Sequence, residues 1–481
     1  MDAERIRSVL RASVSRLSPA RWSANKDADE LEVQAVFPLF EEADETFFAA
    51  LFSFPPEPAC HFAPFVASPR PAPGLRPFEA GKGIYLAEAE LNPRFVRFAV
   101  EAMRGGASSG GTGPVLHWTG KDIPPGRTGL PERLGGDTTN AVASFTIGNK
   151  KAVLKSYRTP DLFNPEPEIL AFLSEKGSKV SPRVLGTVTL AETAGAKPGG
   201  GRSLYLAVLL EFAGGVPAFP AFVGNARRSI FCNLPPHDCI PARLGIAIGD
   251  LHHLLATRGA PPDIRPEAIS AGDIDRWRSA MRARFEDALR ALDADRASRL
   301  VRSRDAFEAL LAGMNGWAGA RKIRTHQDLH LGQVLISRGG FRLLDYEGEP
   351  LRKGPERIEK LPPERDVATL LRSFSYAAAV ALKELKAGHA HEDERAQRWE
   401  HDTASSFIEG YLSACPRSVR KRGKKRLLPA LRVWMAEKAL YEIAYEAKFR
   451  PDWVGIPLEG LLGILNDPFS RQPDASEADQ R

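Results

Sequence analysis

The stretch THQDLHLGQVLISRGGFRLLDYEGEP, at residues 325–350, decides how the rest of this chain is interpreted. It opens with a His-x-Asp pattern that ends at Asp328, and a side-chain amide follows five positions later at Gln333. A second acidic residue, Asp345, lies twelve positions beyond the amide. A lone His-x-Asp is common by chance, but the three polar groups together at these intervals indicate a site.

The same stretch is predicted to fold as a β-hairpin. Two apolar runs, VLI and FRLL, flank the turn signal at 338–340. Gln333 and Asp345 each lie six residues from Gly339. A symmetric hairpin would therefore place these two side chains opposite each other at its open end. Asp328 lies on the loop that enters the same end.

This arrangement has the chemistry of phosphoryl transfer, which needs a carboxylate to deprotonate the attacking hydroxyl and oxygen ligands for Mg²⁺. Asp328 suits the first role, whereas Gln333 and Asp345 offer the hard oxygens that Mg²⁺ prefers. The alternative is a surface hairpin with solvated charges. His326 is interpreted as a packed residue that supports the loop, and His330 as either a substrate contact or a structural residue.

A kinase also needs a cation for the nucleotide phosphates, held in place by a carboxylate. Lys155 ends the apolar run AVLK, and Glu168 lies thirteen residues later in the helical pattern PEPEILAFL. We predict that these two residues form the pair, although an exposed strand end can carry a lysine without such a role. Along the chain, Lys155 comes first, Glu168 second and the loop with Asp328 last. Kinases have the corresponding residues in the same order.

Two further segments are candidates for nucleotide binding. In the turn LGGDTTN, the backbone with Thr138, Thr139 and Asn140 is suited to capping phosphate oxygens, and the alternative is a polar hairpin tip. The run LAVLLEFAGG ends a predicted strand at Glu211 and Phe212. We expect the connection between lobes there, where adenine would meet backbone groups.

The composition of the 481-residue chain, with 43% apolar and 26% charged residues, is that of a globular protein with two or three packed units. The net charge of +6 agrees with an anionic substrate but is too dilute to indicate nucleic-acid binding. The trio Cys232, His237 and Cys239 lacks the second cysteine pair typical of zinc sites. No segment reaches the apolar length of a membrane helix. We therefore expect a cytoplasmic protein without a membrane or nucleic-acid partner.

The predicted secondary structure changes along the chain. The Gly-rich segment RGGASSGGTG, at 104–113, is predicted to be a flexible connection that ends a first domain. Strand patterns dominate residues 133–214, with one helical segment, and helical patterns dominate residues 243–465. A small β-rich lobe followed by a larger helical lobe predicts an α+β, bilobal fold.

These residues resemble a known family. THQDLHLGQVLI followed by LLDYEGEP is similar to the catalytic and metal-binding motifs of bacterial maltokinases. The similarity continues through RDVATLLRSFSYAA (365–378) and EKALYEIAYEAKFRPDWVGIPL (437–458), and ARWSANK (20–26) looks like the opening of that family's cap domain. Gln327, where the family usually has glycine, is a departure.

The resemblance implies the bilobal fold shared by protein kinases and aminoglycoside phosphotransferases. The implied domains are an N-terminal cap at 1–115, a β-rich nucleotide-binding N-lobe at 116–215, and a helical C-lobe at 216–481. The C-lobe would carry both the catalytic loop and the sugar site.

The resemblance also implies roles for single residues. Asp328 would be the catalytic base, and Gln333 with Asp345 would bind Mg²⁺. Lys155 and Glu168 would form the phosphate-binding pair. The implied cofactors are ATP and Mg²⁺, and the implied reaction converts maltose and ATP into maltose 1-phosphate and ADP, feeding α-glucan and glycogen synthesis. The implied partners are the sugar and other enzymes of α-glucan and trehalose metabolism.

Sugar binding is also argued from spacing. Lys438, Tyr441 and Tyr445 fall at i, i+3 and i+7 of a helical pattern, so they share one face. Lysine donates hydrogen bonds to hydroxyls, and tyrosine offers a ring for a pyranose face. Arg450 and Trp453 follow just beyond the helix. The alternative is a core stripe filled by tyrosine, and the resemblance favours sugar binding.

Three functions remain open. They are a maltokinase, a kinase of another sugar such as glucosamine, and a catalytically silent kinase-like protein that binds sugar or nucleotide. The face formed by Lys438, Tyr441 and Tyr445 suits a neutral sugar, whereas an amino sugar would call for extra carboxylates there. The basic run RSVRKRGKKR (417–426) is interpreted as a solvated loop between helices rather than a site for an anionic partner.

Overall fold

The computed structural model divides the chain into two compact units. The sheet unit contains Met1–Ser174, Pro182–Ala213 and Lys353–Arg357, and the helical unit contains Glu175–Ser181, Gly214–Arg352 and Ile358–Arg481. The structure describes residues 1–18, 26–56, 59–72, 74–81, 83–110, 114–135, 140–191, 203–233, 239–352, 354–385, 390–421 and 423–466. The predicted α+β class, with a β-rich part before a helical part, is confirmed.

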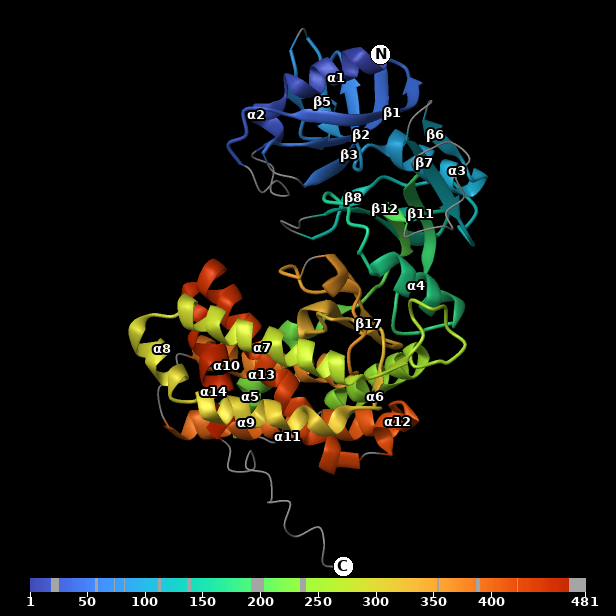
Figure 1. Ribbon diagram of the computed structural model, residues 1–481. Coiled ribbons are helices and arrows are strands. Elements are labelled where there is room, and N and C mark those ends of the chain that lie inside the picture. Colours follow the sequence, from blue (N-terminus) through green and yellow to red (C-terminus); the bar gives the residue numbers. More distant parts are fainter. Residues whose placement is uncertain are drawn as a thin grey trace, which may run out of the picture. The chain divides into compact units, whose positions relative to one another are not determined.

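The first sheet of the sheet unit is antiparallel and has the strand order β1-β2-β3-β5-β4 (Figure 1). The elements are α1 (Ala3–Arg11), α2 (Val14–Leu17), β1 (Glu32–Glu42), β2 (Glu45–Ser53), β3 (Cys60–Ser68), β4 (Phe78–Glu79), β5 (Tyr85–Glu88) and α3 (Pro93–Gly105). Alternate side chains of β2 enter two different cores because they point to opposite faces of the sheet. Phe48 belongs to the cluster that contains Ile6 of α1. Phe47 belongs to the cluster that contains Phe95 of α3.

The second sheet has seven strands in the order β6-β7-β11-β12-β10-β9-β8. Its elements are β6 (Ser108–Gly110), β7 (Val115–Gly120), β8 (Glu132–Arg133), β9 (Ala141–Ile147), β10 (Lys150–Ser156), α4 (Glu166–Glu175), β11 (Val184–Ala191) and β12 (Leu204–Glu211). The strands predicted within residues 133–214 are confirmed as β9, β10, β11 and β12, and the helix predicted in PEPEILAFL is confirmed as α4.

The Gly-rich segment at 104–113 departs from the prediction of a flexible connection. Its first residues complete α3, and Ser108–Gly110 form β6, which pairs with β7. Backbone pairing with a neighbouring strand outweighs the low strand propensity of glycine and serine there. One hydrophobic cluster includes Phe47 of the first sheet and Leu154 of the second. The boundary between the predicted cap at 1–115 and N-lobe at 116–215 stays a prediction.

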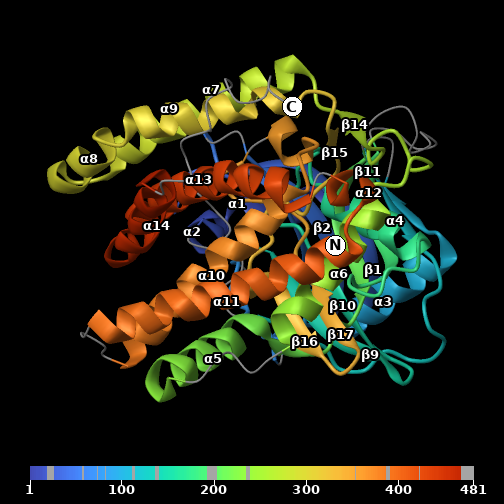
Figure 2. The same cartoon turned by 90° about the horizontal axis from the view of Figure 1, so that it is seen from below.

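Helices dominate the helical unit (Figure 2). Its helices are α5 (Ala218–Cys232), α6 (Ile240–Leu255), α7 (Ala271–Ala291), α8 (Ala294–Val301), α9 (Arg304–Ala312), α10 (Glu364–Leu385), α11 (Ala390–Ala414), α12 (Arg417–Arg420), α13 (Gly423–Phe449) and α14 (Gly455–Asn466). Single turns of 3₁₀ helix are η1 (Gly313–Trp317), η2 (Leu331–Gln333) and η4 (Pro451–Trp453), while η3 (Gly354–Ile358) straddles the two units. In the centre, α10 packs against α5, α11 and α13. None of the helices described in this chain is both long and apolar enough to cross a membrane.

Two segments of the helical unit differ from the predictions. The stretch after the second sheet, for which no helix is predicted, forms α5. The basic run at 417–426, predicted to be a loop, contains the single turn α12 and the start of α13. Lysine and arginine have good helix propensity, so a charged run between two helices can continue their structure.

The hairpin predicted around Gly339 is confirmed. It consists of β16 (Val334–Ser337) and β17 (Gly340–Leu343), and β13 (Val216–Pro217) adds a third strand. Ser337 pairs with Gly340, so the register is one residue away from the symmetric expectation. The smaller strands β14 (Glu267–Ala268) and β15 (Arg321–Lys322) pair with each other and precede the loop that carries Asp328.

Candidate active site

The loop that carries Asp328 is held by a buried carboxylate at the start of α10. Asp366 accepts hydrogen bonds from the backbone N–H groups of His326, at 2.8 Å, and Gln327, at 3.0 Å. The Nε2 atom of His252 on α6 lies 3.2 Å from the same carboxylate. Asp366 and His252 are both fully buried. Gln327 adopts φ +68°, a left-handed conformation that is costly for a residue other than glycine. The clamp therefore fixes a strained loop in one conformation.

The histidines of this loop have different surroundings. His326 is buried, its Nε2 atom lies 2.9 Å from the carbonyl oxygen of Leu344, and its ring packs 4.4 Å from that of Tyr346. This placement agrees with the supporting role predicted for His326. His330 accepts a hydrogen bond from the N–H of Gly332 at 3.0 Å, and its Nε2 atom lies 3.7 Å from Asp328. Burial lowers the pKa of His330, which favours the neutral imidazole.

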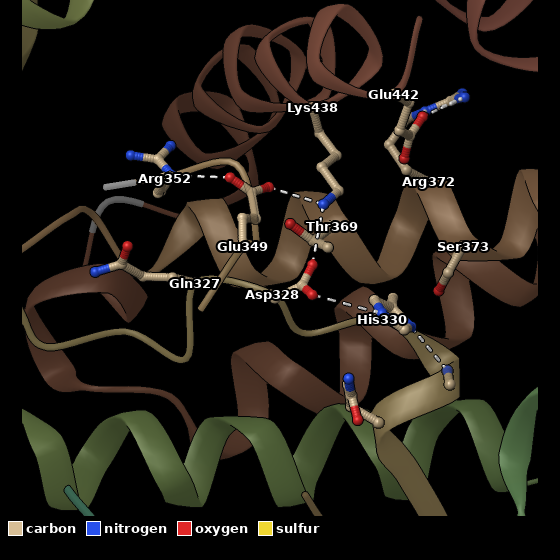
Figure 3. Close-up of polar contacts among 12 residues, drawn as sticks. Gln327, Asp328, His330, Glu349, Arg352, Thr369, Arg372, Ser373, Lys438 and Glu442 are labelled. Carbon is tan, nitrogen blue, oxygen red and sulfur yellow. Dashed lines mark hydrogen bonds and ion pairs between the residues drawn. The ribbon is translucent and has the colours of Figure 1, made fainter. Parts of the chain in front are cut away.

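Asp328 contacts a lysine that is itself held by buried charges (Figure 3). The Nζ atom of Lys438 donates to Asp328 at 3.1 Å and to Glu349 at 2.8 Å. Glu349 is fully buried and also accepts from Arg352 at 2.8 Å and Arg365 at 2.7 Å. Burial lowers the pKa of Lys438, but the charges of Glu349 and Asp328 outweigh it and hold that pKa above its usual range. Lys438 is therefore a fixed ammonium beside the predicted base.

The structure brings the two predicted metal ligands together. The Nε2 atom of Gln333 donates to Oδ2 of Asp345 at 3.2 Å. Asp345 reaches this position through a left-handed conformation, with φ +62°. An amide oxygen and a carboxylate within reach of each other form a donor set that fits Mg²⁺. Their role as metal ligands stays a prediction.

A cavity of about 490 Å³ lies within the helical unit and is lined by Asp328, Gln333 and Asp345. One face of α13 lines the same cavity, with further residues from just beyond that helix: Lys438, Tyr441, Glu442, Tyr445, Glu446, Arg450 and Trp453. The members of this face follow the i, i+3, i+4, i+7 and i+8 spacing of a helix. All the residues predicted to bind sugar, including His330, therefore meet the predicted base in one cavity.

Aromatic rings and one guanidinium form part of the cavity wall. The rings of Tyr441 and Tyr445 stack with centroids 6.3 Å apart and an interplanar angle of 16°. The guanidinium of Arg450 lies 5.7 Å from the ring of Tyr445 and 5.3 Å from that of Trp453. Flat apolar faces with polar edges suit the faces and hydroxyls of a sugar ring.

Two carboxylates on α13 were missed by the sequence predictions. Glu442 accepts from Nε and Nη2 of Arg372 at 3.1 and 3.0 Å. Glu446 accepts through Oε1 from Tyr376 at 3.2 Å and from Arg450 at 2.7 Å. Its other oxygen, Oε2, is buried and has no hydrogen-bond partner among the described residues. Burial raises the pKa of both glutamates. Glu442 and Glu446 lie four and eight positions after Lys438. This helical spacing would have placed both on the same face of α13 as Lys438.

In the sheet unit, Lys155 donates to Glu166 at 2.7 Å. Glu166 also accepts from the hydroxyl of Tyr157 at 2.7 Å and is 1% exposed. The predicted partner, Glu168, lies half-buried one position past Pro167 in the first turn of α4. Glu166 was not among the predicted nucleotide residues, and the pairing of Lys155 with Glu168 stays a prediction.

The remaining predicted nucleotide residues also lie in the sheet unit. Asn140 accepts from the backbone N–H of Arg158 at 3.3 Å, and Thr138 and Thr139 lie outside the described residues. Glu211 ends β12, and the N–H of Phe212 donates to a backbone carbonyl of β10 at 3.2 Å. Their binding roles stay predictions.

A clamped carboxylate loop, an amide and carboxylate pair on a hairpin, and a buried strand lysine paired with a helix glutamate define a phosphoryl-transfer enzyme. Residues 131–399 match the model of the phosphotransferase enzyme family, APH. Because this match covers more than half of the chain, the chain belongs to the phosphotransferase enzyme family.

Sugar kinases are among the proteins that this chain resembles. It is 25% identical to the glucosamine kinase of Streptacidiphilus jiangxiensis over 335 residues, which are 68% of this chain and 72% of that protein. It is 28% identical to the glucosamine kinase of Mycolicibacterium smegmatis over 238 residues, which are 48% of this chain and 55% of that protein. The structure of a glucosamine kinase in complex with glucosamine, ADP and inorganic phosphate matches with a TM-score of 0.68 at 20% identity, covering 95% of this chain and 99% of that one. The kinase-like fold is thereby confirmed over nearly the whole chain.

Proposed function

We propose that this chain is an ATP-dependent sugar kinase whose acceptor carries an amino group, with glucosamine as the leading substrate. The observation that carries the proposal is Glu446, which lines the cavity together with Asp328 and whose buried Oε2 atom has no hydrogen-bond partner among the described residues. A buried carboxylate oxygen without a partner is costly, and a substrate ammonium would satisfy it. Glu442 adds a second carboxylate on the same helix face.

The reaction follows from the side chains around Asp328. Its carboxylate orients the attacking sugar hydroxyl and accepts the hydroxyl proton as the oxygen bonds to the γ-phosphorus of ATP and ADP leaves. Lys438, held by Glu349, fixes the position of Asp328 through the contact at 3.1 Å. Mg²⁺, when held by Gln333 and Asp345, would supply charge neutralisation at the nucleotide phosphates.

The nucleotide is expected on the sheet unit. Lys155, buried and paired with Glu166 at 2.7 Å, offers a fixed cation for phosphate oxygens. The end of β12 at Glu211 and Phe212 offers backbone groups for adenine. The relatives named glucosamine kinase, one of them solved with ADP, support this assignment of donor and acceptor.

Maltose, the acceptor implied by the resemblance to maltokinases, is the competing substrate. Tyr441 and Tyr445 suit a neutral sugar, but maltose would offer no cation to Glu446, whose Oε2 atom has no hydrogen-bond partner among the described residues. An amino sugar uses both the rings and the carboxylates, so the geometry favours it. The implied link to α-glucan and glycogen synthesis depends on maltose as the acceptor. It does not apply if the acceptor is an amino sugar.

The test is a panel of acceptors incubated with the purified protein, ATP and Mg²⁺. The panel contains glucosamine, glucose, maltose, trehalose and a control without sugar, and ADP release is followed while phosphorus NMR identifies the product. We expect glucosamine to stimulate ADP release most and to give a phosphate monoester. Stimulation by maltose with an anomeric phosphate signal would restore the maltokinase prediction, and no stimulation by any sugar would contradict the proposal.

A further inference from the structure

A second hollow of the helical unit shares no lining residue with the cavity described above. Its volume is about 280 Å³. Its polar lining consists of His253, Thr257, Arg258, Arg321, Arg417 and Ser418. No acidic side chain is among the described residues that line it. The hollow is therefore a concave and positively charged part of the surface.

Three different segments bring the three arginines together. Arg258 follows α6, Arg321 is in β15, and Arg417 begins α12 (Figure 2). Within the described part of the chain, none of these three guanidiniums makes a hydrogen bond or an ion pair. Other surface arginines of the unit are neutralised, as Arg282 is by Glu308 at 2.6 Å. Like charges held around one hollow repel each other, so an anion bound there would relieve an unfavourable arrangement.

The donors of this hollow match a phosphate group. Guanidinium groups present planar pairs of N–H donors that bind phosphate oxygens in a bidentate manner. The hydroxyls of Thr257 and Ser418 and the imidazole of His253 add shorter polar groups to the wall. The volume suits a small molecule rather than an extended polymer.

We propose that this hollow binds the phosphate group of a small molecule, either inorganic phosphate or a phosphate monoester such as a sugar phosphate, and that its occupancy stabilises the catalytic loop. The second part rests on the proposed function, because it assigns Asp328 to catalysis. The stabilisation of the loop by a bound phosphate is inferred from two chain segments that connect the hollow to the loop.

The first connection runs through α6. His253 lines the hollow, and its neighbour His252 lies 3.2 Å from Asp366, the residue that holds the N–H groups of the catalytic loop. The second connection runs through β15, since Arg321 lies seven residues before Asp328 on the strand that leads into the loop. A ligand that holds Arg321 and the end of α6 together would restrain both attachments of the loop.

The binding test uses isothermal titration at constant ionic strength with inorganic phosphate and, separately, glucose 6-phosphate. Three proteins are compared: the natural chain, the double variant Arg258→Ser and Arg417→Ser, and a control with Lys421→Ser and Lys425→Ser. The control loses the same charge from the adjacent basic run without touching the hollow. All four substituted side chains are exposed, so the variants are expected to fold.

We expect the natural chain and the control to bind phosphate alike, and the arginine variant to bind about tenfold or more weakly at one site. Phosphate bound at the active site is common to all three proteins and cancels in the comparison. Tighter binding of glucose 6-phosphate would identify a monoester as the ligand, whereas equal binding would identify the phosphate group alone as sufficient. Identical titrations for all three proteins would overturn the site.

The coupling is tested by hydrogen–deuterium exchange of residues 324–333, with and without inorganic phosphate. Phosphate is expected to slow exchange of this loop in the natural chain and the control more than in the arginine variant. Equal slowing in all three would overturn the coupling. Neither assay uses a sugar or measures turnover, so a failure here is distinguishable from a failure of the proposed kinase activity.

Discussion

Asp328 is the residue on which the proposed chemistry depends. Asp328→Asn keeps the shape of the side chain but removes the proton acceptor, so kcat should fall about 10²- to 10⁴-fold. Nucleotide binding should change little, because Lys155 and Glu166 pair with each other within the sheet unit. Steady-state ADP release and ATP titration measure the two effects. The control is Asp250→Asn, an exposed aspartate of α6, and equal activity of both variants would remove Asp328 from the mechanism.

Glu446 gives the affinity for an amino sugar a defined dependence on pH. Burial raises the pKa of Glu446, so this carboxylate takes up a proton at a higher pH than a free glutamate, whose pKa is about 4.3. Protonation removes the charge that attracts an ammonium. The KM for glucosamine should therefore rise as the pH falls from about 7 to about 5. Glu446→Gln should show a smaller rise in KM over the same pH range. If KM of the variant depends on pH as strongly as KM of the natural chain does, Glu446 is excluded as the titrating group.

At the scale of elements, α10 supports the loop that carries Asp328 through Asp366. Asp366→Asn places an amide against the N–H groups of His326 and Gln327 and should destabilise the fold by about 1–3 kcal/mol. Burial raises the pKa of Asp366, but the hydrogen bond and charge of His252 outweigh it and hold that pKa below its usual range. The stabilisation is thus fully present above the unfolded pKa of about 3.9 and is lost as the pH falls through the folded pKa.

Urea unfolding at about pH 7 and at a pH below about 3.9 measures this dependence. The difference between the natural chain and Asp366→Asn should be larger at the higher pH. Asp250→Asn again serves as the control, because it removes an exposed charge from α6 without touching the loop. A difference that grows as the pH falls would contradict the role given to Asp366.

The hairpin of β16 and β17 sets the positions of Gln333 and Asp345, and its turn offers a matched pair of glycines. Gly340 has φ +125°, a positive value that residues with a side chain rarely adopt, whereas the φ of Gly339 is not positive. An added Cβ would meet no other atom within 4 Å at either position, so the two glycines differ in backbone conformation and not in available space. Gly340→Ala should therefore cost about 1–3 kcal/mol through backbone strain and raise the Mg²⁺ concentration needed for half-maximal activity. Gly339→Ala should change neither quantity appreciably. Equal effects of the two variants would show that the turn does not control the positions of the two predicted metal ligands.

At the scale of the whole molecule, local patterns predicted a strand-rich region followed by a helix-rich one. Alternating apolar residues placed the four long strands of the second sheet, and the paired apolar runs placed the hairpin that brings Gln333 to Asp345. These signals are local because strand alternation and turn chemistry are set by neighbours in sequence. The kinase-like fold was implied by the resemblance and is confirmed by the family match and the solved relative.

What the sequence did not predict depends on tertiary packing. The contact of Lys155 with Glu166 was not predicted, because it depends on the orientation of α4. The strand β6 depends on β7, because its glycine and serine residues have little strand propensity of their own. Glu442 and Glu446 lay on a predicted helix face, but only the surrounding helices show that this face lines a cavity. The buried pair of Glu349 and Lys438 joins residues far apart in sequence.

The most direct test of the central claim compares kcat/KM for glucosamine and glucose in the natural chain and in Glu446→Gln. The two sugars differ at the amino group, and the variant removes the charge proposed to recognise it. Our prediction is that the natural chain prefers glucosamine, and that the variant loses about tenfold to hundredfold in kcat/KM for glucosamine while kcat/KM for glucose changes little. Equal losses for both sugars, or a natural chain that prefers a neutral sugar such as maltose, would contradict it.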